Sequence, residues 1–147
     1  MSRHHSRLAA LPSRLPIVFL VLTCVILPRA AGAQALREIG RTAAGNPVLV
    51  EQRTIRRALP LVDATVRVRF AQAVKAREGD WWASRTRLTL DCASRRVKIY
   101  ENWYYGDTTW RRVVTHKVVG IPGFGTVLGG SMTSVAYDAL CAAPPPK

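Results

Sequence analysis

Residues 62–105 read VDATVRVRFAQAVKAREGDWWASRTRLTLDCASRRVKIYENWYY, and their patterning determines the fold class. Near the start of this stretch, Val66 and Val68 alternate with Arg67 and Arg69. An alternation with a period of two residues is typical of a strand that has one buried face. Runs with similar alternation occur before and after this strand. The strands predicted in this way cover residues 47–55, 62–74, 85–92, 96–105 and 109–119.

The connections between the central strands are short and rich in turn-forming residues. They fall at residues 76–80, 93–95 and 106–107. Loops of this length cannot make parallel crossovers, so the sequence predicts an antiparallel meander.

A helix is predicted after the last strand. Ser131 is a suitable N-cap, and the apolar side chains that follow it have helical spacing. These are Met132, Val135, Ala136, Ala139 and Leu140. The expected fold is therefore α+β, an antiparallel sheet meander with a C-terminal helix packed on one face and a single disulfide.

The first 33 residues have the pattern of an export signal. A basic, acid-free segment precedes an apolar run at 17–27, which is shorter than the roughly 20 residues of a membrane span. Small-x-small patterns favour cleavage after Ala33 or Ala35. We expect export from a bacterial cytoplasm to the periplasm or the cell surface, the alternative being an uncleaved N-terminal anchor.

The remaining 114 residues are enough for one domain with a modest core. Residues 34–45 are polar and contain glycine, which predicts a flexible lead-in. The domain is expected over 46–142, followed by a disordered, proline-rich tail at 143–147.

Two cysteines, Cys92 and Cys141, remain once the signal with Cys24 is removed. In an oxidising compartment, an even pair favours a disulfide. Closing a loop of this length contributes about 4 kcal/mol in the chain-entropy model. A reactive thiol pair is the alternative, although no Cys-x-x-Cys motif is present.

Basic residues outnumber acidic ones by 22 to 9, and the chain beyond residue 33 keeps a net charge of +9. Such a field attracts polyanions in a salt-dependent way. Because the protein is expected outside the cytoplasm, nucleic acid is not expected as a partner. An acidic or extracellular-matrix protein, an anionic glycan or envelope lipid remain as partners, and the alternative is that the arginines form only a solvated surface.

Enzymatic and metal chemistry find little support in the sequence. His116 is the one histidine beyond the signal, so a histidine ligand cluster is impossible, and no nucleophile elbow surrounds any serine. The glycine-rich loop at 120–130 lacks the Lys-Ser/Thr pair of a phosphate-binding loop. We therefore expect no catalytic residues, no metal and no cofactor, with His116 a half-exposed strand residue.

Aromatic residues interleave with the arginines of the predicted strands. Trp103 and Tyr105 share one side of their strand and Tyr104 the other, because neighbouring side chains alternate. Exposed Trp and Tyr beside Arg suit recognition of a partner, whereas packing within the core is the alternative for each ring. The candidate binding face comprises Arg67, Arg69, Arg85, Arg87, Trp103 and Tyr105.

Several features between residues 66 and 141 occur together in a known family. They are the strand before Asp91-Cys92, the Arg95-Arg96-Val97 entry into the next strand, the aromatic Tyr104-Tyr105, and the final Ser131 … Ala139-Leu140-Cys141. In these features the chain resembles the surface-adhesin protein E family of small exported Gram-negative proteins. The resemblance implies an antiparallel sheet with a packed helix, a Cys92–Cys141 disulfide, and a capacity for homodimerisation. It also implies adhesion to host matrix proteins, the activity of the family's named member.

The sequence thus predicts an exported, non-enzymatic binding protein of the cell envelope. It would hold a macromolecular partner through a basic, aromatic-bearing sheet face. The alternative is a structural or assembly role inside the periplasm, without adhesion to a host.

Overall fold

An antiparallel sheet accounts for most of the described chain. The structure is a computed structural model, and it describes residues 35–142. Its elements are β1 (Leu36–Arg41), β2 (Pro47–Glu51), the short 3₁₀-helix η1 (Gln52–Thr54), β3 (Arg56–Ala58), β4 (Leu61–Val74), β5 (Trp81–Asp91), β6 (Arg96–Tyr105), β7 (Val113–Val118), β8 (Phe124–Thr126) and α1 (Met132–Cys141).

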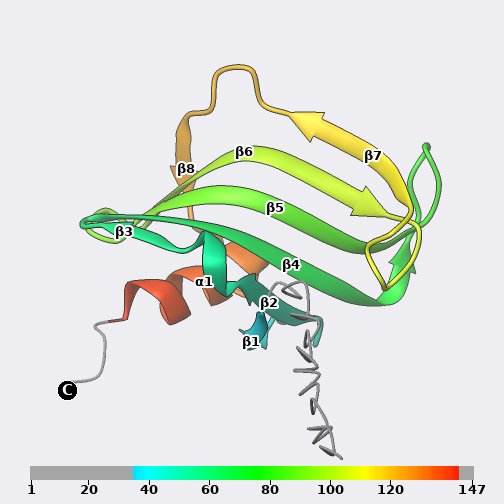
Figure 1. Ribbon diagram of the computed structural model, residues 1–147, viewed down its shortest axis with the longest axis horizontal. Coiled ribbons are helices and arrows are strands. Elements are labelled where there is room, and N and C mark those ends of the chain that lie inside the picture. Colours follow the sequence, from blue (N-terminus) through cyan, green and yellow to red (C-terminus); the bar gives the residue numbers. More distant parts are fainter. Residues whose placement is uncertain (1–34, 143–147) are drawn as a thin grey trace, which may run out of the picture. The chain divides into compact units, whose positions relative to one another are not determined.

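The strands follow the order β1-β2-β4-β5-β6-β7, while β3 pairs with β4 and β8 pairs with β6 (Figure 1). Every pairing is antiparallel. The consecutive strands β4 to β7 form the predicted meander. The fold class expected from the sequence is confirmed.

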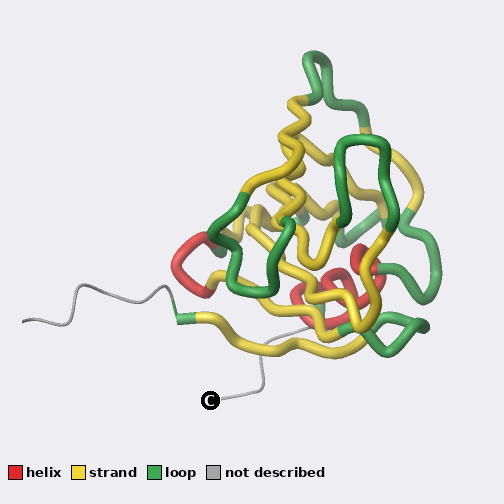
Figure 2. The backbone as a smooth tube through the Cα atoms, turned by 90° about the vertical axis from the view of Figure 1, so that its right-hand side faces the viewer, coloured by secondary structure: helices red, strands yellow, loops and turns green. Residues whose placement is uncertain are grey.

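The hydrophobic core lies between the sheet and α1, which is next to β1, β2 and β4 (Figure 2). Alternate residues of the long strands face it, and Val66, Val68 and Leu88 are at most 3% exposed. The helix contributes Ala136 and Leu140, which are fully buried. Its first turn is capped as predicted, because the Ser131 hydroxyl accepts a hydrogen bond from the Ser134 amide.

The disulfide between Cys92 and Cys141 is confirmed. It joins the end of α1 to the turn after β5, with the two Cα atoms 5.4 Å apart. The hydroxyl of Tyr137 donates a hydrogen bond of 2.7 Å to the carbonyl of Cys92, close to the same junction. Both links hold the helix against the sheet.

The flexible lead-in expected over 34–45 was a wrong prediction for half of its length, since residues 36–41 form β1. Its apolar residues Leu36 and Ile39 are three apart, and the pairing with β2 shifts between Glu38 and Gly40. This bulge breaks the alternation that would have identified a strand. Gly40 has a φ of +148°, and a β-carbon there would lie 2.8 Å from Val135 of the helix.

Two predicted strands are shorter than expected. The first, predicted over 47–55, stops at Glu51, because Thr54 donates a hydrogen bond to the Glu51 carbonyl and accepts one from the Thr65 amide. The strand predicted over 109–119 begins at Val113, because the Asp107 carboxylate holds the preceding turn. The glycine-rich loop also contains β8, whose three residues pair with β6.

The predicted signal at 1–33 and the tail at 143–147 lie outside the described residues. Within residues 35–142, no helix combines the length and the apolar character that crossing a membrane requires.

Candidate functional site

The sheet face opposite α1 carries a row of charged and aromatic side chains that crosses four strands. Arg67 of β4 pairs with Arg85 of β5, Arg85 with Trp103 of β6, and Trp103 with His116 of β7. Directly opposed residues share a face of a sheet, so these four side chains lie side by side. We refer to this surface as the arginine face.

A buried carboxylate bridges the two opposed arginines of this row and offsets part of their charge. Glu51, at the end of β2, is fully buried. Its Oε1 accepts hydrogen bonds of 2.7 Å from the Nε atoms of both Arg67 and Arg85, and its Oε2 accepts one of 3.2 Å from Nη2 of Arg85. Two like charges opposite each other would repel, so the carboxylate makes the row possible.

The electrostatics of Glu51 follow from this arrangement. Burial alone would raise the pKa of its carboxyl, but the hydrogen bonds and charges of Arg85 and Arg67 outweigh burial, and the net pKa lies below the ordinary value. The hydrogen bond to Glu51 likewise raises the pKa of Arg85. Both groups are therefore held in their charged forms.

Aromatic rings lie against the guanidinium groups. Arg85 lies 4.7 Å from the ring centre of Trp103, and the same ring stacks on His116 at 4.8 Å between ring centres. His116 lies 3.3 Å from Oε2 of Glu101, whose Oε1 pairs with Arg87 at 2.8 Å. These contacts order long side chains that would otherwise be free in solvent.

Trp110 covers the far end of the row. It lies in the turn between β6 and β7, with Arg69 at 4.7 Å and Arg67 at 5.1 Å from its ring centre. Its φ of +57° is unusual for a bulky residue and is imposed by the turn. The turn is held by Asp107, whose pKa is lowered mainly by the hydrogen bond from the Thr109 side chain.

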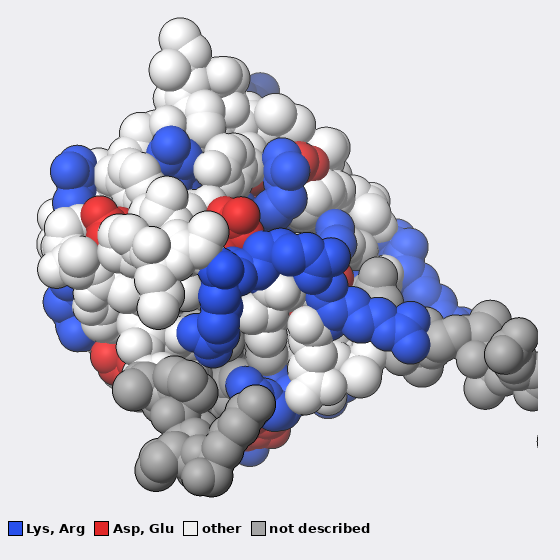
Figure 3. Space-filling model, turned by 60° about the vertical axis from the view of Figure 1, so that its left-hand side comes forward, with Lys and Arg blue, Asp and Glu red and all other residues white. Residues whose placement is uncertain are grey.

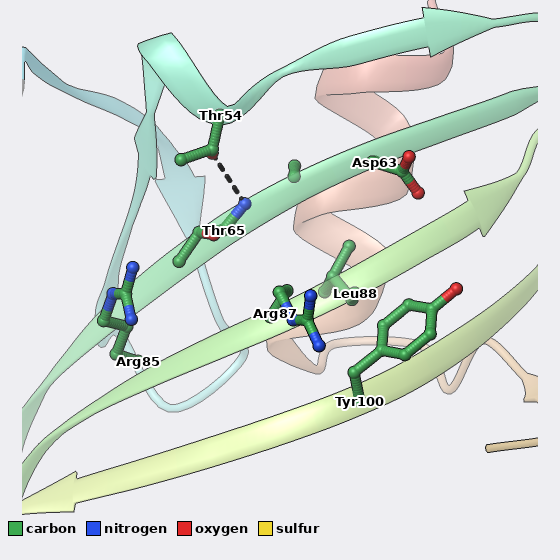
Figure 4. Close-up of a pocket in the computed structure, with 8 residues that line it drawn as sticks. Thr54, Asp63, Thr65, Arg85, Arg87, Leu88 and Tyr100 are labelled. Atoms are coloured by element: carbon green, nitrogen blue, oxygen red, sulfur yellow. Dashed lines mark hydrogen bonds between the residues drawn. The ribbon is translucent and has the colours of Figure 1, made fainter. Parts of the chain in front are cut away.

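A groove of about 500 Å³ lies on the arginine face, between η1 and β6. Figure 4 shows side chains of β4, β5 and β6 in front of the sheet, with the helix behind it. The lining residues are Thr54, Asp63, Ala64, Thr65, Arg85, Arg87, Leu88 and Tyr100. Arg87 lies 5.0 Å from the ring centre of Tyr100 on one wall.

Further exposed arginines lie beside this groove, on η1 and β3. Arg53 and Arg56 are exposed, and Arg56 lies opposite Asp63 in the β3–β4 ladder. Arg57 is directed to the other face, where its Nη1 donates a hydrogen bond to the Leu140 carbonyl of α1. Figure 3, in which the left-hand side of Figure 1 comes forward, shows Lys and Arg side chains in a nearly continuous run with few acidic groups among them. The basic surface thus extends from the sheet onto η1 and β3.

The structure brings all six residues of the predicted binding face onto one side of the sheet. Their role in binding stays a prediction. Tyr105 is only 6% exposed, and burial raises the pKa of its hydroxyl, so it supports its neighbours rather than offering a surface. Tyr104 lies elsewhere, as predicted, with its ring stacked on Trp81 at 3.9 Å.

Sequence reasoning missed several groups at this face, namely Glu51, Tyr100, Glu101 and Trp110. Glu51 had a usable signal, since it is an acidic residue directly after an apolar strand in a strongly basic chain. Trp110 had none, because its position depends on how the turn folds back over β4.

The arrangement offers little for catalysis. His116 is half exposed in β7, as predicted, and it contacts the ring of Trp103 and the carboxylate of Glu101. Among residues 35–142, no three His, Cys, Asp or Glu side chains gather as a metal site would require. A fixed array of guanidinium and aromatic groups is suited to holding an anionic surface.

Comparison with solved structures identifies similar folds. One crystal form of Haemophilus influenzae protein E is 11% identical, with a TM-score of 0.50 over 69% of this chain and 85% of that chain. The selenomethionine form of the same protein is 12% identical, with a TM-score of 0.49 over 76% and 92% of the two chains. At this identity, the first match shows similarity of fold alone.

Sequence comparison adds no relative. No model of a known protein family matches the chain, and no curated protein matches it significantly.

Proposed function

We propose that the protein is an exported, non-enzymatic binding protein of the cell envelope, which holds an anionic macromolecular partner on the arginine face. The observation that carries the proposal is the row from Arg67 to His116, ordered by buried Glu51 and by stacked rings on the sheet face that α1 leaves uncovered. Pre-ordered side chains lose less entropy when a partner binds. An adhesin-like role agrees with the fold shared with protein E.

Location in the envelope is supported by two features of different kinds. The N-terminal pattern of a basic segment, an apolar run and small-x-small sites is typical of an export signal. The Cys92–Cys141 disulfide belongs to an oxidising compartment, such as the periplasm or the cell surface.

Binding by this face is expected to depend strongly on salt, because guanidinium groups displace counterions from a polyanion. The test is a titration of the purified mature protein with heparin, fibronectin and vesicles containing anionic phospholipid, each at 50 and 200 mM salt. Saturable binding that weakens at the higher salt to at least one of the three is expected. Absence of saturable binding to all three would remove the proposal.

Two matched double variants locate the binding surface. Arg69→Gln with Arg87→Gln removes two charges from the arginine face, whereas Arg37→Gln with Arg77→Gln removes two from β1 and the β4–β5 turn. The first pair should weaken binding at least tenfold and the second pair less than threefold. Equal losses would show that net charge matters and the arginine face does not.

A second candidate function is structural assembly within the periplasm. It is favoured by β7, an edge strand, because Val113 and Val118 are 51% and 66% exposed and the following Ile121 is 95% exposed. Unpaired edges with apolar side chains are sites where another strand can add. Protease digestion of intact cells separates the candidates, since cleavage indicates surface display and protection indicates a periplasmic protein.

A further inference from the structure

The groove beside η1 differs chemically from the rest of the arginine face. Its volume of about 500 Å³ lies within the roughly 300–1,000 Å³ of small-ligand sites. It is therefore too small for a whole macromolecule and large enough for a short segment of one. Its floor is formed by β4 and β5, and its walls by Thr54 of η1 and Tyr100 of β6 (Figure 4).

The arginine donors in the groove are held in place by hydrogen bonds and ion pairs with two carboxylates. Arg85 uses Nε and Nη2 on Glu51, and Arg87 uses Nη2 on Glu101. A guanidinium has five N–H donors in a planar fork, so each arginine keeps donors that these carboxylates do not occupy. Arg56, which lies opposite the groove residue Asp63 in the β3–β4 ladder, adds a third cation beside the groove. Its Nη1 donates to the carbonyls of Arg53 and Ile55.

An acceptor lies at the other end of the same groove. The Asp63 carboxylate accepts a hydrogen bond from Thr89, whose hydroxyl also lies 3.0 Å from that of Tyr100. Donors at one end and a carboxylate at the other suit a ligand that has both a negative group and N–H groups. A peptide with an acidic side chain has both.

The aromatic rings on this face argue against a neutral glycan. A neutral sugar binds such a face by stacking on a free ring, but Trp103 is already in contact with both Arg85 and His116. Tyr100 has Arg87 over its ring. A carboxylate needs no free ring, because it pairs with guanidinium groups in a planar, bidentate way.

We propose that this groove binds an acidic side chain on an extended segment of a partner protein. The carboxylate pairs with the free donors of Arg85 and Arg87, Arg56 supplies further positive charge beside the groove, and Asp63 accepts a main-chain N–H of the segment. The proposal rests on the proposed function and specifies the chemistry of the partner.

The test uses fluorescence anisotropy with two labelled octapeptides, one containing alternating Glu and Gly and one in which each Glu is replaced by Gln. The mature protein should bind the Glu peptide saturably at 50 mM salt and the Gln peptide at least tenfold more weakly. Equal affinity for the two peptides would overturn the proposal.

Single substitutions then test whether the Glu peptide binds in the groove. Arg87→Gln and, separately, Arg56→Gln should each weaken binding of the Glu peptide at least fivefold, while Arg77→Gln, in the distant β4–β5 turn, should change it less than twofold. Arg56 is exposed, and within residues 35–142 its side chain donates to carbonyls of its own turn, so its variant should fold even if Arg87→Gln does not. Unchanged binding by Arg56→Gln and a folded Arg87→Gln would overturn the proposal.

Failure of this inference is distinguishable from failure of the proposed function. Salt-dependent binding of heparin or anionic vesicles without binding of the Glu peptide overturns the peptide groove and leaves the arginine face as a polyanion-binding surface. Absence of binding to every probe removes both.

Discussion

Replacing Glu51 with Gln tests whether the buried carboxylate holds the arginine face together. The substitution keeps the size of the side chain and removes its charge. Gln can still accept hydrogen bonds through one oxygen, but its amide group would then meet Nη2 of Arg85, where Oε2 accepts at present. Arg67 and Arg85 would lie opposite each other without the negative charge of Glu51 between them.

The expected cost follows from burial. Removing one partner of a buried ion pair destabilises a protein by about 3–5 kcal/mol. The carboxylate is fully buried, while the side chains of Arg67 and Arg85 are 16% and 24% exposed. Solvent therefore reaches the arginines in part, and we expect the lower end, about 3 kcal/mol.

Urea unfolding followed by circular dichroism measures this cost. With a slope of about 1–3 kcal/mol per molar urea, the midpoint should fall by about 1–3 M. Glu38→Gln is the matched control, because Glu38 pairs with Arg41 at 3.3 Å and both side chains are about half exposed. Its free energy of unfolding should stay within about 0.5 kcal/mol of the parent. If Glu51→Gln behaves like this control, the reasoning about the buried carboxylate is wrong.

Three other predictions concern stability. Since the folded-state pKa of Glu51 lies below its unfolded value of about 4.3, its contribution is present above that pH and lost as the pH falls through the folded pKa. As the pH is lowered from 7 to 2, the urea midpoint of Glu51→Gln should therefore decrease less steeply than that of the parent protein. The same pH dependence in both proteins would contradict this. Replacing Cys92 and Cys141 together with Ala should lower the free energy of unfolding by about 4 kcal/mol, and an unchanged urea midpoint would show that the disulfide contributes nothing. Gly40→Ala should lower the free energy of unfolding by about 1–3 kcal/mol, because the φ of residue 40 is +148° and the new β-carbon would meet Val135. Gly120→Ala is the control and should be neutral, because the space around Gly120 is open. Equal melting temperatures of the two variants in thermal unfolding would refute the packing of β1 on the helix.

Much of the fold could be predicted because the long strands repeat a simple pattern. The alternation of Val66 and Val68 with Arg67 and Arg69 fixes which face is buried, and the capping residue Ser131 marks where the helix starts. What could not be predicted depends on contacts between distant segments. β1 is interrupted by a bulge, and β8 is a three-residue strand that exists because β6 lies beside it.

The site was predictable to a similar degree. Period-two spacing places Arg85, Arg87 and Trp103 on one face once the register of β5 and β6 is known. The spacing cannot show that Glu51 accepts hydrogen bonds from two of the arginines, since that requires β2 to lie beside β4. Nor can it show that Tyr105, on the same face, is buried, or that Trp110 lies against Arg69 of β4.

The most direct test of the account is to observe where a polyanion touches the folded protein. In ¹⁵N-labelled protein, the indole N–H signals of Trp103 and Trp110 report on the arginine face. The signal of Trp81, whose ring stacks on Tyr104 on the other side of β6, serves as a reference. Titration with poly-L-glutamate at 50 mM salt should shift the Trp103 and Trp110 signals saturably and leave the Trp81 signal in place. Saturable shifts of Trp81 or of α1 residues, with Trp103 and Trp110 unmoved, would place binding elsewhere and contradict the central claim.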